Sequence, residues 1–204
     1  MKKILLALTT IAALSTSVAA ADTGIYLGVG YGTTSYYDDD MVKDIAPKAS
    51  LDQSDAGLKV YTGWMINKIV GVELGYTDYG SFAVSNSSID VSSYSIAANL
   101  GYTFLDGQLR PFGLAGISYI SNDYPSGDAN NDVDPTNGGL HLGVGVSYVP
   151  TVLHGVGFRL AYETDIYSAD TVSVSGFGTS TTTTTTDTYT QSVGNLYVGV
   201  EYNF

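Results

Sequence analysis

Apolar and small or polar residues alternate one by one along most of the chain, a period of two that is typical of β-strands. In residues 24–32, Ile25, Leu27 and Val29 occupy one face, and Tyr26 shares the other face with glycines. Seven further segments follow the same rule: residues 58–64, 70–77, 94–104, 110–120, 140–148, 156–163 and 196–204. The alternation therefore predicts eight strands, and no comparable helical period follows the N-terminal segment.

The two faces of these strands are inverted relative to those of a soluble barrel. One face carries bulky apolar residues, whereas the other carries glycine, serine and a few charges. The second face has too few polar and charged side chains to form the outer surface of a soluble protein. An apolar exterior in lipid around a small polar lumen accounts for this pattern. The fifth segment is ambiguous, and we favour Ala115, Ile117 and Tyr119 as its outward face over Phe112 and Leu114.

The connections between the strands alternate in length. Three are turn-sized, at residues 65–68, 105–108 and 150–154. Four are long and polar, around residues 33–56, 78–92, 121–138 and 167–190. Short periplasmic turns and long extracellular loops are typical of outer-membrane barrels. We therefore predict an all-β fold, an eight-stranded antiparallel up-and-down transmembrane β-barrel with both ends at the short-turn side.

The charge balance excludes several classes of protein. Acidic residues outnumber Lys and Arg by 20 to 8, and the formal net charge is −12, so a nucleic-acid partner is not expected. The chain has no cysteine, which excludes a thiol nucleophile, a cysteine-based metal site and a disulfide scaffold. Asp22 and Asp106 are expected near the short-turn end of the barrel, and the other aspartates are assigned to the four long loops.

The N-terminal segment has the form of a secretory signal peptide. Lys2 and Lys3 precede an apolar run over residues 4–14, which is followed by small residues up to Ala21. The run is shorter than the ~20 residues that a membrane-spanning helix needs. We expect residues 1–20 to be the signal peptide, with cleavage after Ala20 or Ala21, and residues 21–204 to form the barrel domain.

The C-terminus carries a recognisable arrangement of aromatic residues. Gly199, Tyr202 and the terminal Phe204 have the spacing of the assembly signal of bacterial outer-membrane barrels, and the mature chain resembles the small eight-stranded OmpA/OmpX-like family. The resemblance implies a monomer in the outer membrane, surrounded by phospholipid and lipopolysaccharide and inserted with periplasmic chaperones and the barrel-insertion machinery. No counterpart of the OmpA periplasmic domain follows Phe204, so tethering to the cell wall is not expected.

Six titratable residues fall on the predicted inward face: Lys59, Glu73, His141, Arg159, Glu163 and Glu201. Counted from the short turns, all but His141 and Glu163 are expected at one depth, whereas these two should face each other across their hairpin. Pairing is expected because an isolated charge in a narrow lumen is costly. OmpA-like barrels contain a comparable network that closes the lumen, which implies a plug here; a gated ion path and catalysis remain the alternatives.

Other features suggest little chemistry. Trp64, Phe104 and Tyr148 lie at the short-turn end of outward faces, as expected for an aromatic girdle at a membrane interface. Neither His141 nor His154 adjoins a serine motif, so we predict no enzyme activity and no cofactor.

Two polar segments remain. The acidic run at residues 128–134 lacks the EF-hand glycine and glutamate, which favours a solvated loop over a Ca²⁺ site. The threonine-rich residues 179–190 are interpreted as a mobile loop tip.

These observations predict a structural or surface-interacting, adhesin-like protein of a Gram-negative outer membrane, with an unidentified ligand at its loops. A narrow channel for small solutes is the first alternative. A lipid-modifying enzyme is the second, and a soluble lipocalin-like binder the third.

Overall fold

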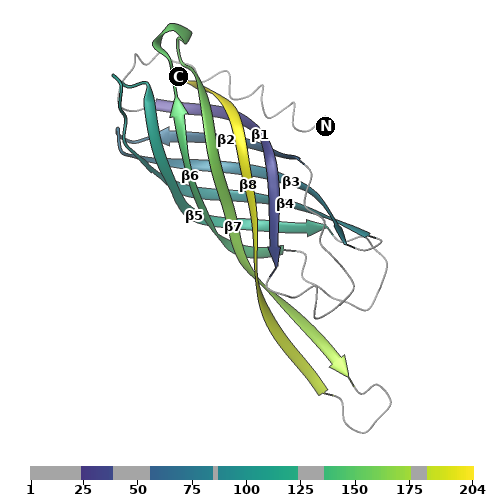
Figure 1. The fold of residues 1–204 in the computed structure, drawn as a ribbon. Coiled ribbons are helices and arrows are strands. Elements are labelled where there is room, and N and C mark those ends of the chain that lie inside the picture. Colours follow the sequence, from purple (N-terminus) through teal and green to yellow (C-terminus); the bar gives the residue numbers. More distant parts are fainter. Residues whose placement is uncertain (1–23, 39–55, 85–86, 124–135, 176–182) are drawn as a thin grey trace.

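The chain folds into a closed barrel of eight antiparallel strands, each hydrogen-bonded to its sequence neighbours, with β1 and β8 closing the ring (Figure 1). The computed structural model describes residues 24–38, 56–84, 87–123, 136–175 and 183–204. The strands are β1 (Gly24–Asp38), β2 (Ala56–Met65), β3 (Val70–Val84), β4 (Ser87–Gly101), β5 (Leu109–Asp123), β6 (Thr136–Tyr148), β7 (Val156–Ser175) and β8 (Thr183–Asn203). The predicted fold class is confirmed.

Three tight connections lie at one end of the barrel. Asn67 accepts hydrogen bonds from the amides of Ile69 and Val70, both at 2.8 Å, and so closes the turn between β2 and β3. The β4–β5 turn passes through Gly107 at φ 93°, and the β6–β7 connection contains a short 3-10 helix, η2 (Thr151–Leu153). Backbone with positive φ favours glycine, and these turns use it where the chain reverses.

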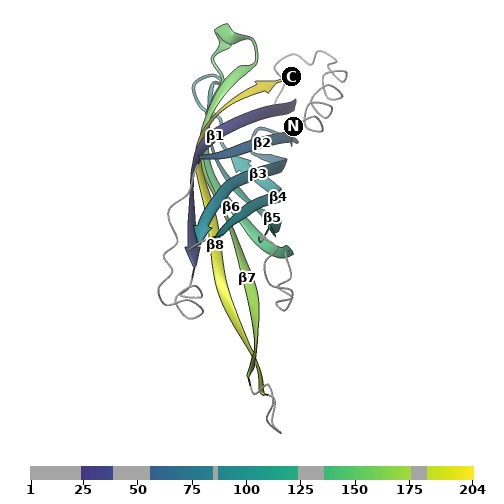
Figure 2. The same cartoon turned by 90° about the vertical axis from the view of Figure 1, so that its right-hand side faces the viewer.

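At the opposite end two strands continue well past the others. Figures 1 and 2 show β7 and β8 leaving the barrel as a two-stranded ribbon. Eight residue pairs, from Ser168↔Thr190 to Ser175↔Thr183, lie beyond the last pair that β7 makes with β6 and that β8 makes with β1. The interpretation of residues 167–190 as a polar loop is therefore wrong for residues 167–175 and 183–190, which are strand. The predicted mobile tip at residues 179–190 is wrong for Thr183–Thr190, and residues 179–182 lie outside the described residues. Threonine is β-branched and favours extended backbone, and the repetitive composition concealed a strand.

The strands alternate between an outward apolar face and a lumenal face. On β5, Ile117 is 66% exposed and Tyr119 53%, whereas Phe112 and Leu114 are at most 6% exposed. The favoured outward face of this strand is therefore confirmed. Its ambiguity in the sequence has a physical cause, because Phe112 and Leu114 fill space inside the lumen and make both faces of β5 apolar. Within the described ranges, no helix is long and apolar enough to cross a bilayer.

Candidate functional site in the barrel lumen

Buried charged and aromatic side chains fill the lumen in two groups. The Arg159 cluster comprises Arg159, Glu73, Glu201, Tyr26 and Tyr61. The His141 cluster comprises His141, Lys59, Glu163, Asp165 and Tyr79. All ten side chains are almost completely buried. Every charge in these clusters is thus held inside a narrow barrel of eight strands, whose interior is only wide enough for side chains.

In the Arg159 cluster one guanidinium bridges two carboxylates on different strands. Nη1 of Arg159 donates to both carboxylate oxygens of Glu73, at 3.1 and 3.0 Å, and its Nε donates to Glu201 at 3.1 Å. Tyr26 donates its hydroxyl to Glu73 at 2.5 Å, and Tyr61 donates to Glu201 at 3.3 Å. Both carboxylates therefore receive further donors, which offsets part of the cost of burying them.

Aromatic rings surround the same guanidinium. The guanidinium carbon of Arg159 lies 3.9 Å from the ring centroid of Tyr61, 4.6 Å from that of Phe112 and 5.3 Å from that of Tyr26. Cation–π contacts of this kind stabilise a cation that has left water. The rings need glycine beneath them, because a Cβ at Gly28 would overlap the ring of Tyr61. The glycine face of β1 thus makes room for these rings.

A third cation lies toward the short-turn end. Nη1 of Arg110 donates to the side-chain oxygen of Asn99 at 2.7 Å, and the amide of Asn99 in turn donates to Glu73 at 3.1 Å. Below these groups is a cavity of about 100 Å³, lined by Arg110, Arg159 and Glu201 among others. Side chains therefore occupy most of the lumen at this end, and the space that remains is of a size for waters.

The His141 cluster joins β2, β3, β6 and β7 nearer the long-loop end. Nζ of Lys59 lies 2.5 Å from Oε2 of Glu163, and Tyr197 donates its hydroxyl to the other oxygen of Glu163 at 2.6 Å. Nδ1 of His141 lies 2.7 Å from Asp165, and its Nε2 lies 3.4 Å from Glu163. Tyr79 donates to the second oxygen of Asp165 at 2.7 Å.

The structure corrects two expectations about depth and pairing. Lys59 and Glu73 lie on the two strands of one hairpin but belong to different clusters. Strands in a barrel are tilted and staggered, so the number of residues from a turn does not give the depth in the lumen. The backbone partner of His141 is Asp165, and Glu163 pairs with Gly143 instead. The β6–β7 turn is centred one residue later than we assumed, which shifts the register by two.

Asp165 and Arg110 were not identified as lumenal charges from the sequence. Asp165 was assigned to a long loop, although it follows Glu163 by two residues and is fully buried on the same face of β7. The available signal was that alternation, which continues past Glu163. Arg110 is the second residue of β5, the strand whose two faces were ambiguous. Because Phe112 points into the lumen, alternation would have placed Arg110, two residues earlier, on the same face.

The clusters do not assemble a catalytic group. Both ring nitrogens of His141 face carboxylates, so no serine lies in the position that a base would activate among the side chains that the structure describes. His154 is exposed in the β6–β7 turn at φ 46°. The described residues hold no group of three or more metal-binding side chains. The absence of enzyme activity stays a prediction.

The aromatic residues expected at the interface point outward. Trp64 is 59% exposed, Phe104 lies next to the β4–β5 turn, and Tyr148 ends β6. At the C-terminus, Tyr202 and Phe204 pack edge to face with ring centroids 4.9 Å apart. Gly199, the third residue of the proposed assembly signal, lies inward, where a Cβ would approach the hydroxyl of Tyr61. The signal peptide and the acidic run at residues 128–134 lie outside the described residues.

The comparisons with known proteins agree with this architecture. The profile of the outer membrane protein beta-barrel domain matches residues 4–204. No curated protein sequence gives a significant match.

Among solved structures, the outer membrane protein OprG from Pseudomonas aeruginosa is similar with a TM-score of 0.54 and 15% identity, over 89% of this chain and 96% of OprG. Neisserial surface protein A is similar with a TM-score of 0.54 and 17% identity, over 89% and 97%. Ail of Yersinia pestis, in complex with the heparin analogue sucrose octasulfate, is similar with a TM-score of 0.51 and 15% identity, over 89% and 99%. At these identities the likeness is one of fold.

Proposed function

The chain belongs to the outer membrane protein beta-barrel family, and from that premise we propose that it is a surface-interacting, adhesin-like protein whose β7–β8 ribbon makes the contact. In this proposal the signal peptide directs export, and Tyr202 and Phe204 are recognised during insertion. The monomeric barrel sits in phospholipid and lipopolysaccharide, with its short turns in the periplasm. The long-loop end then faces the environment, and with it the ribbon.

The observation that carries the proposal is the pair of open edges along the ribbon. Beyond Tyr167 and Gln191, β7 and β8 pair with each other but with no third strand that the structure describes. Such an edge presents unpaired N–H and C=O groups, which bind an extended segment of another chain by adding a strand. Eight residue pairs give an edge of about 26 Å at ~3.3 Å per residue, long enough for a full strand.

The charge of the chain limits the chemistry of the partner. With 20 acidic and 8 basic residues, the protein repels polyanions and attracts basic surfaces. Ail has been solved in complex with a heparin analogue, which is a polyanion. We therefore propose that the partner of this chain is a basic, extended protein segment and that heparin-like ligands do not bind.

The test uses a non-adherent Gram-negative host that expresses the chain. An immobilised peptide of alternating threonine and lysine should retain these cells, whereas an alternating proline and lysine peptide of equal charge should not, because proline lacks the backbone donors of a sheet ladder. Replacing residues 169–189 by Asn-Gly leaves Ser168 and Thr190 paired across a two-residue hairpin turn. Cells expressing this shortened barrel should lose the attachment.

A matched control separates the edges from the charge. The Asp170→Asn, Asp187→Asn variant keeps the ribbon and removes its two carboxylates, and attachment should largely persist. Heat-modifiable migration on gels establishes that each variant is folded at the wild-type level. Undiminished attachment by the shortened barrel, or equal retention on the two peptides, would show that the ribbon edge is not the contact.

The filled lumen favours this role over the alternative of a narrow channel. The two clusters occupy the space between the strands, and the cavity at the short-turn mouth has a volume of only about 100 Å³. In this proposal they form a structural plug. No second function is favoured by a specific observation.

A further inference from the structure

The barrel wall opens between β6 and β7 near the long-loop end. The β6–β7 ladder ends at the Gly139↔Tyr167 pair, although β6 continues to Thr136 beside β5 and β7 continues into the ribbon. Gly138 is the next residue of β6 toward the long-loop end, and it has no side chain with which to close the gap. A Cβ built at Gly138 meets no atom within 4 Å.

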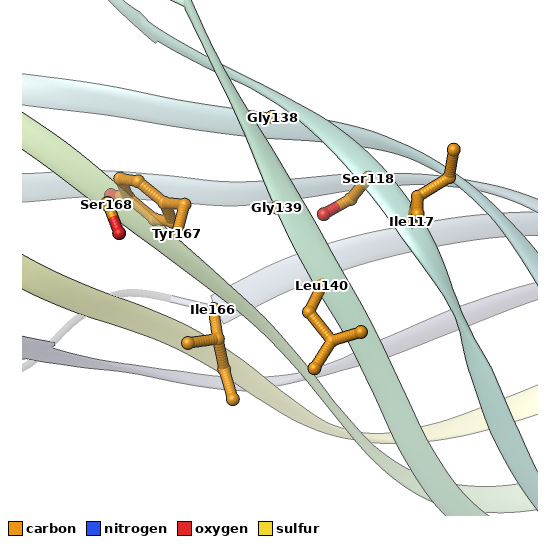
Figure 3. Close-up of a pocket in the computed structure, with 8 residues that line it drawn as sticks. All are labelled: Ile117, Ser118, Gly138, Gly139, Leu140, Ile166, Tyr167 and Ser168. Atoms are coloured by element: carbon orange, nitrogen blue, oxygen red, sulfur yellow. The ribbon is translucent and has the colours of Figure 1, made fainter.

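A notch of about 480 Å³ lies at this junction (Figure 3). Its lining comes from both faces of the wall, which distinguishes it from an ordinary surface groove. Ile117, Leu140 and Ile166 belong to the outward face, whereas Ser118 and Tyr167 are buried and belong to the lumenal face. The notch therefore reaches from the lipid-facing surface through the thickness of the wall.

A row of outward tyrosines leads to the notch. Tyr76, Tyr94 and Tyr119 are direct partners across β3, β4 and β5, and the next position in this row, opposite Tyr119, is Gly138. Tyrosine rings gather where the acyl chains meet the headgroups. Gly138 thus lies beside Tyr119 on the neighbouring strand, and the notch opens next to an outward ring of the kind that gathers near lipid headgroups.

Apolar side chains close the notch on the lumenal side. Tyr79, Val91, Ile120, Tyr167 and Val193 form one packed cluster, and each is at most 2% exposed. The side chain of Ile120 lies close to Gly139, at the back of the notch. An occupant can therefore enter the wall from the bilayer but is stopped by this cluster.

One polar atom in the lining lacks a partner. The hydroxyl of Ser118 is buried and has no hydrogen bond within the part of the chain that the structure describes. Buried hydroxyls are normally paired, because an unsatisfied one costs free energy. An ester carbonyl or a hydroxyl at the head end of an acyl chain would satisfy it, while the chain contacts Leu140 and Ile166.

We propose that the notch between β6 and β7 is a binding site for a single acyl chain of a bilayer lipid, with its polar end hydrogen-bonded to Ser118. The site is continuous with the lipid-facing surface of the barrel, so its occupant comes from the surrounding leaflet. In this proposal Gly138 controls access, because a bulky side chain there would enter the open space beside it.

The chain has no cysteine, so single thiols report on access. The full chain is inserted into phosphatidylcholine vesicles as the Ser118→Cys or the Ser95→Cys variant and treated with a long-chain N-alkylmaleimide dissolved in the bilayer. Ser95 is the matched control, since it faces Ser118 directly across β4 and β5 but lies where the wall is continuous. We expect labelling of the Ser118→Cys variant to be about tenfold faster, because a closed ladder must first open locally.

Filling the notch should abolish the difference. Adding Gly138→Leu to Ser118→Cys should reduce its labelling to the rate of Ser95→Cys. Equal rates for the two single variants, unchanged labelling after Gly138→Leu, or faster labelling of Ser118→Cys by a sulfonated, water-soluble maleimide would overturn the proposal.

A second measurement leaves Ser118 unchanged. The wild-type chain and the Gly138→Leu variant are purified in detergent from the same vesicles, and the phosphatidylcholine retained per barrel is measured by mass spectrometry. We expect the wild-type barrel to retain lipid and the variant to lose it. Equal retention by the two proteins contradicts the proposal even if the thiol variants fail to fold.

Discussion

The two clusters in the lumen satisfy buried charge in different ways. Arg159 uses a planar, forked group to hold Glu73 and Glu201 at once, and three aromatic rings cover it. In the His141 cluster the only permanent cation is the compact ammonium of Lys59, which contacts Glu163. Asp165 depends on the imidazole of His141 and the hydroxyl of Tyr79.

The difference shows how one side chain can organise a narrow lumen. A guanidinium presents five donors in fixed directions, whereas an ammonium is a point charge on a flexible stem. We therefore expect the Arg159 cluster to depend on a single residue. The His141 cluster divides its carboxylate contacts between Lys59 and His141, so it should lose less when Lys59 is removed.

The largest effect is expected from Arg159→Ala. This change leaves Glu73 and Glu201 buried without their shared cation, which should lower the free energy of unfolding by about 3–5 kcal/mol. The urea midpoint of the barrel in detergent measures it. Removing Glu201 in the same chain should recover part of the loss, because the two changes are coupled. A stability indifferent to Arg159 would refute the plug interpretation.

The same variant should also change conductance. The wild-type barrel is expected to conduct little in planar bilayers, and Arg159→Ala should conduct more because it opens space beside Tyr61. Arg159→Lys is the control, since it keeps the charge and loses the fork. A large, steady wild-type conductance would instead support the channel alternative.

A smaller effect is expected from Lys59→Met, which keeps most of the length of the side chain and removes the charge. Glu163 retains the hydroxyl of Tyr197 at 2.6 Å and the ring of His141. The expected loss is therefore about 1–3 kcal/mol, the range for an under-satisfied buried group. Urea unfolding in the same detergent measures it, and a loss as large as that of Arg159→Ala would remove the contrast between the clusters.

The smallest effects are expected from removing single hydroxyls. Tyr26→Phe takes one donor from Glu73, and Tyr79→Phe takes one from Asp165. Each should cost about 0.5–1.5 kcal/mol, or up to twice that because the acceptor is charged. Since Glu73 also receives Arg159 and Asn99, Tyr26→Phe should cost less than Tyr79→Phe. The reverse order in chemical denaturation would contradict this view of the two clusters.

The alternation of residues was enough to predict the barrel, because period two, the inverted faces and the alternating connections depend only on local patterns. It was also enough to place Lys59, Glu73, Arg159 and Glu201 on the inward face. It did not predict which charges meet, since the partners of Arg159 and Lys59 depend on strand tilt and stagger, which are properties of the closed ring.

The remaining errors came from strand ends. The threonines at residues 183–190 belong to a strand that runs past the point where apolar alternation stops, whereas Asp165 lies where the alternation of β7 still continues but was assigned to the loop that follows. Outside a membrane a strand needs no apolar face, so its sequence resembles that of a loop. The wall notch at Gly138 is a property of three neighbouring strands and has no local signal.

The two lumenal clusters also have a consequence for the kinetics of the barrel. The hydrogen bonds from Arg159 to Glu73 and from Tyr79 to Asp165 each join residues 86 positions apart, on strands that do not neighbour one another. We expect such contacts to form only after β1 has met β8 and the ring has closed, and therefore to be absent from an earlier transition state. Interactions made that late slow unfolding without accelerating folding. The Arg159 cluster should therefore lengthen the lifetime of the inserted barrel more than it speeds its assembly.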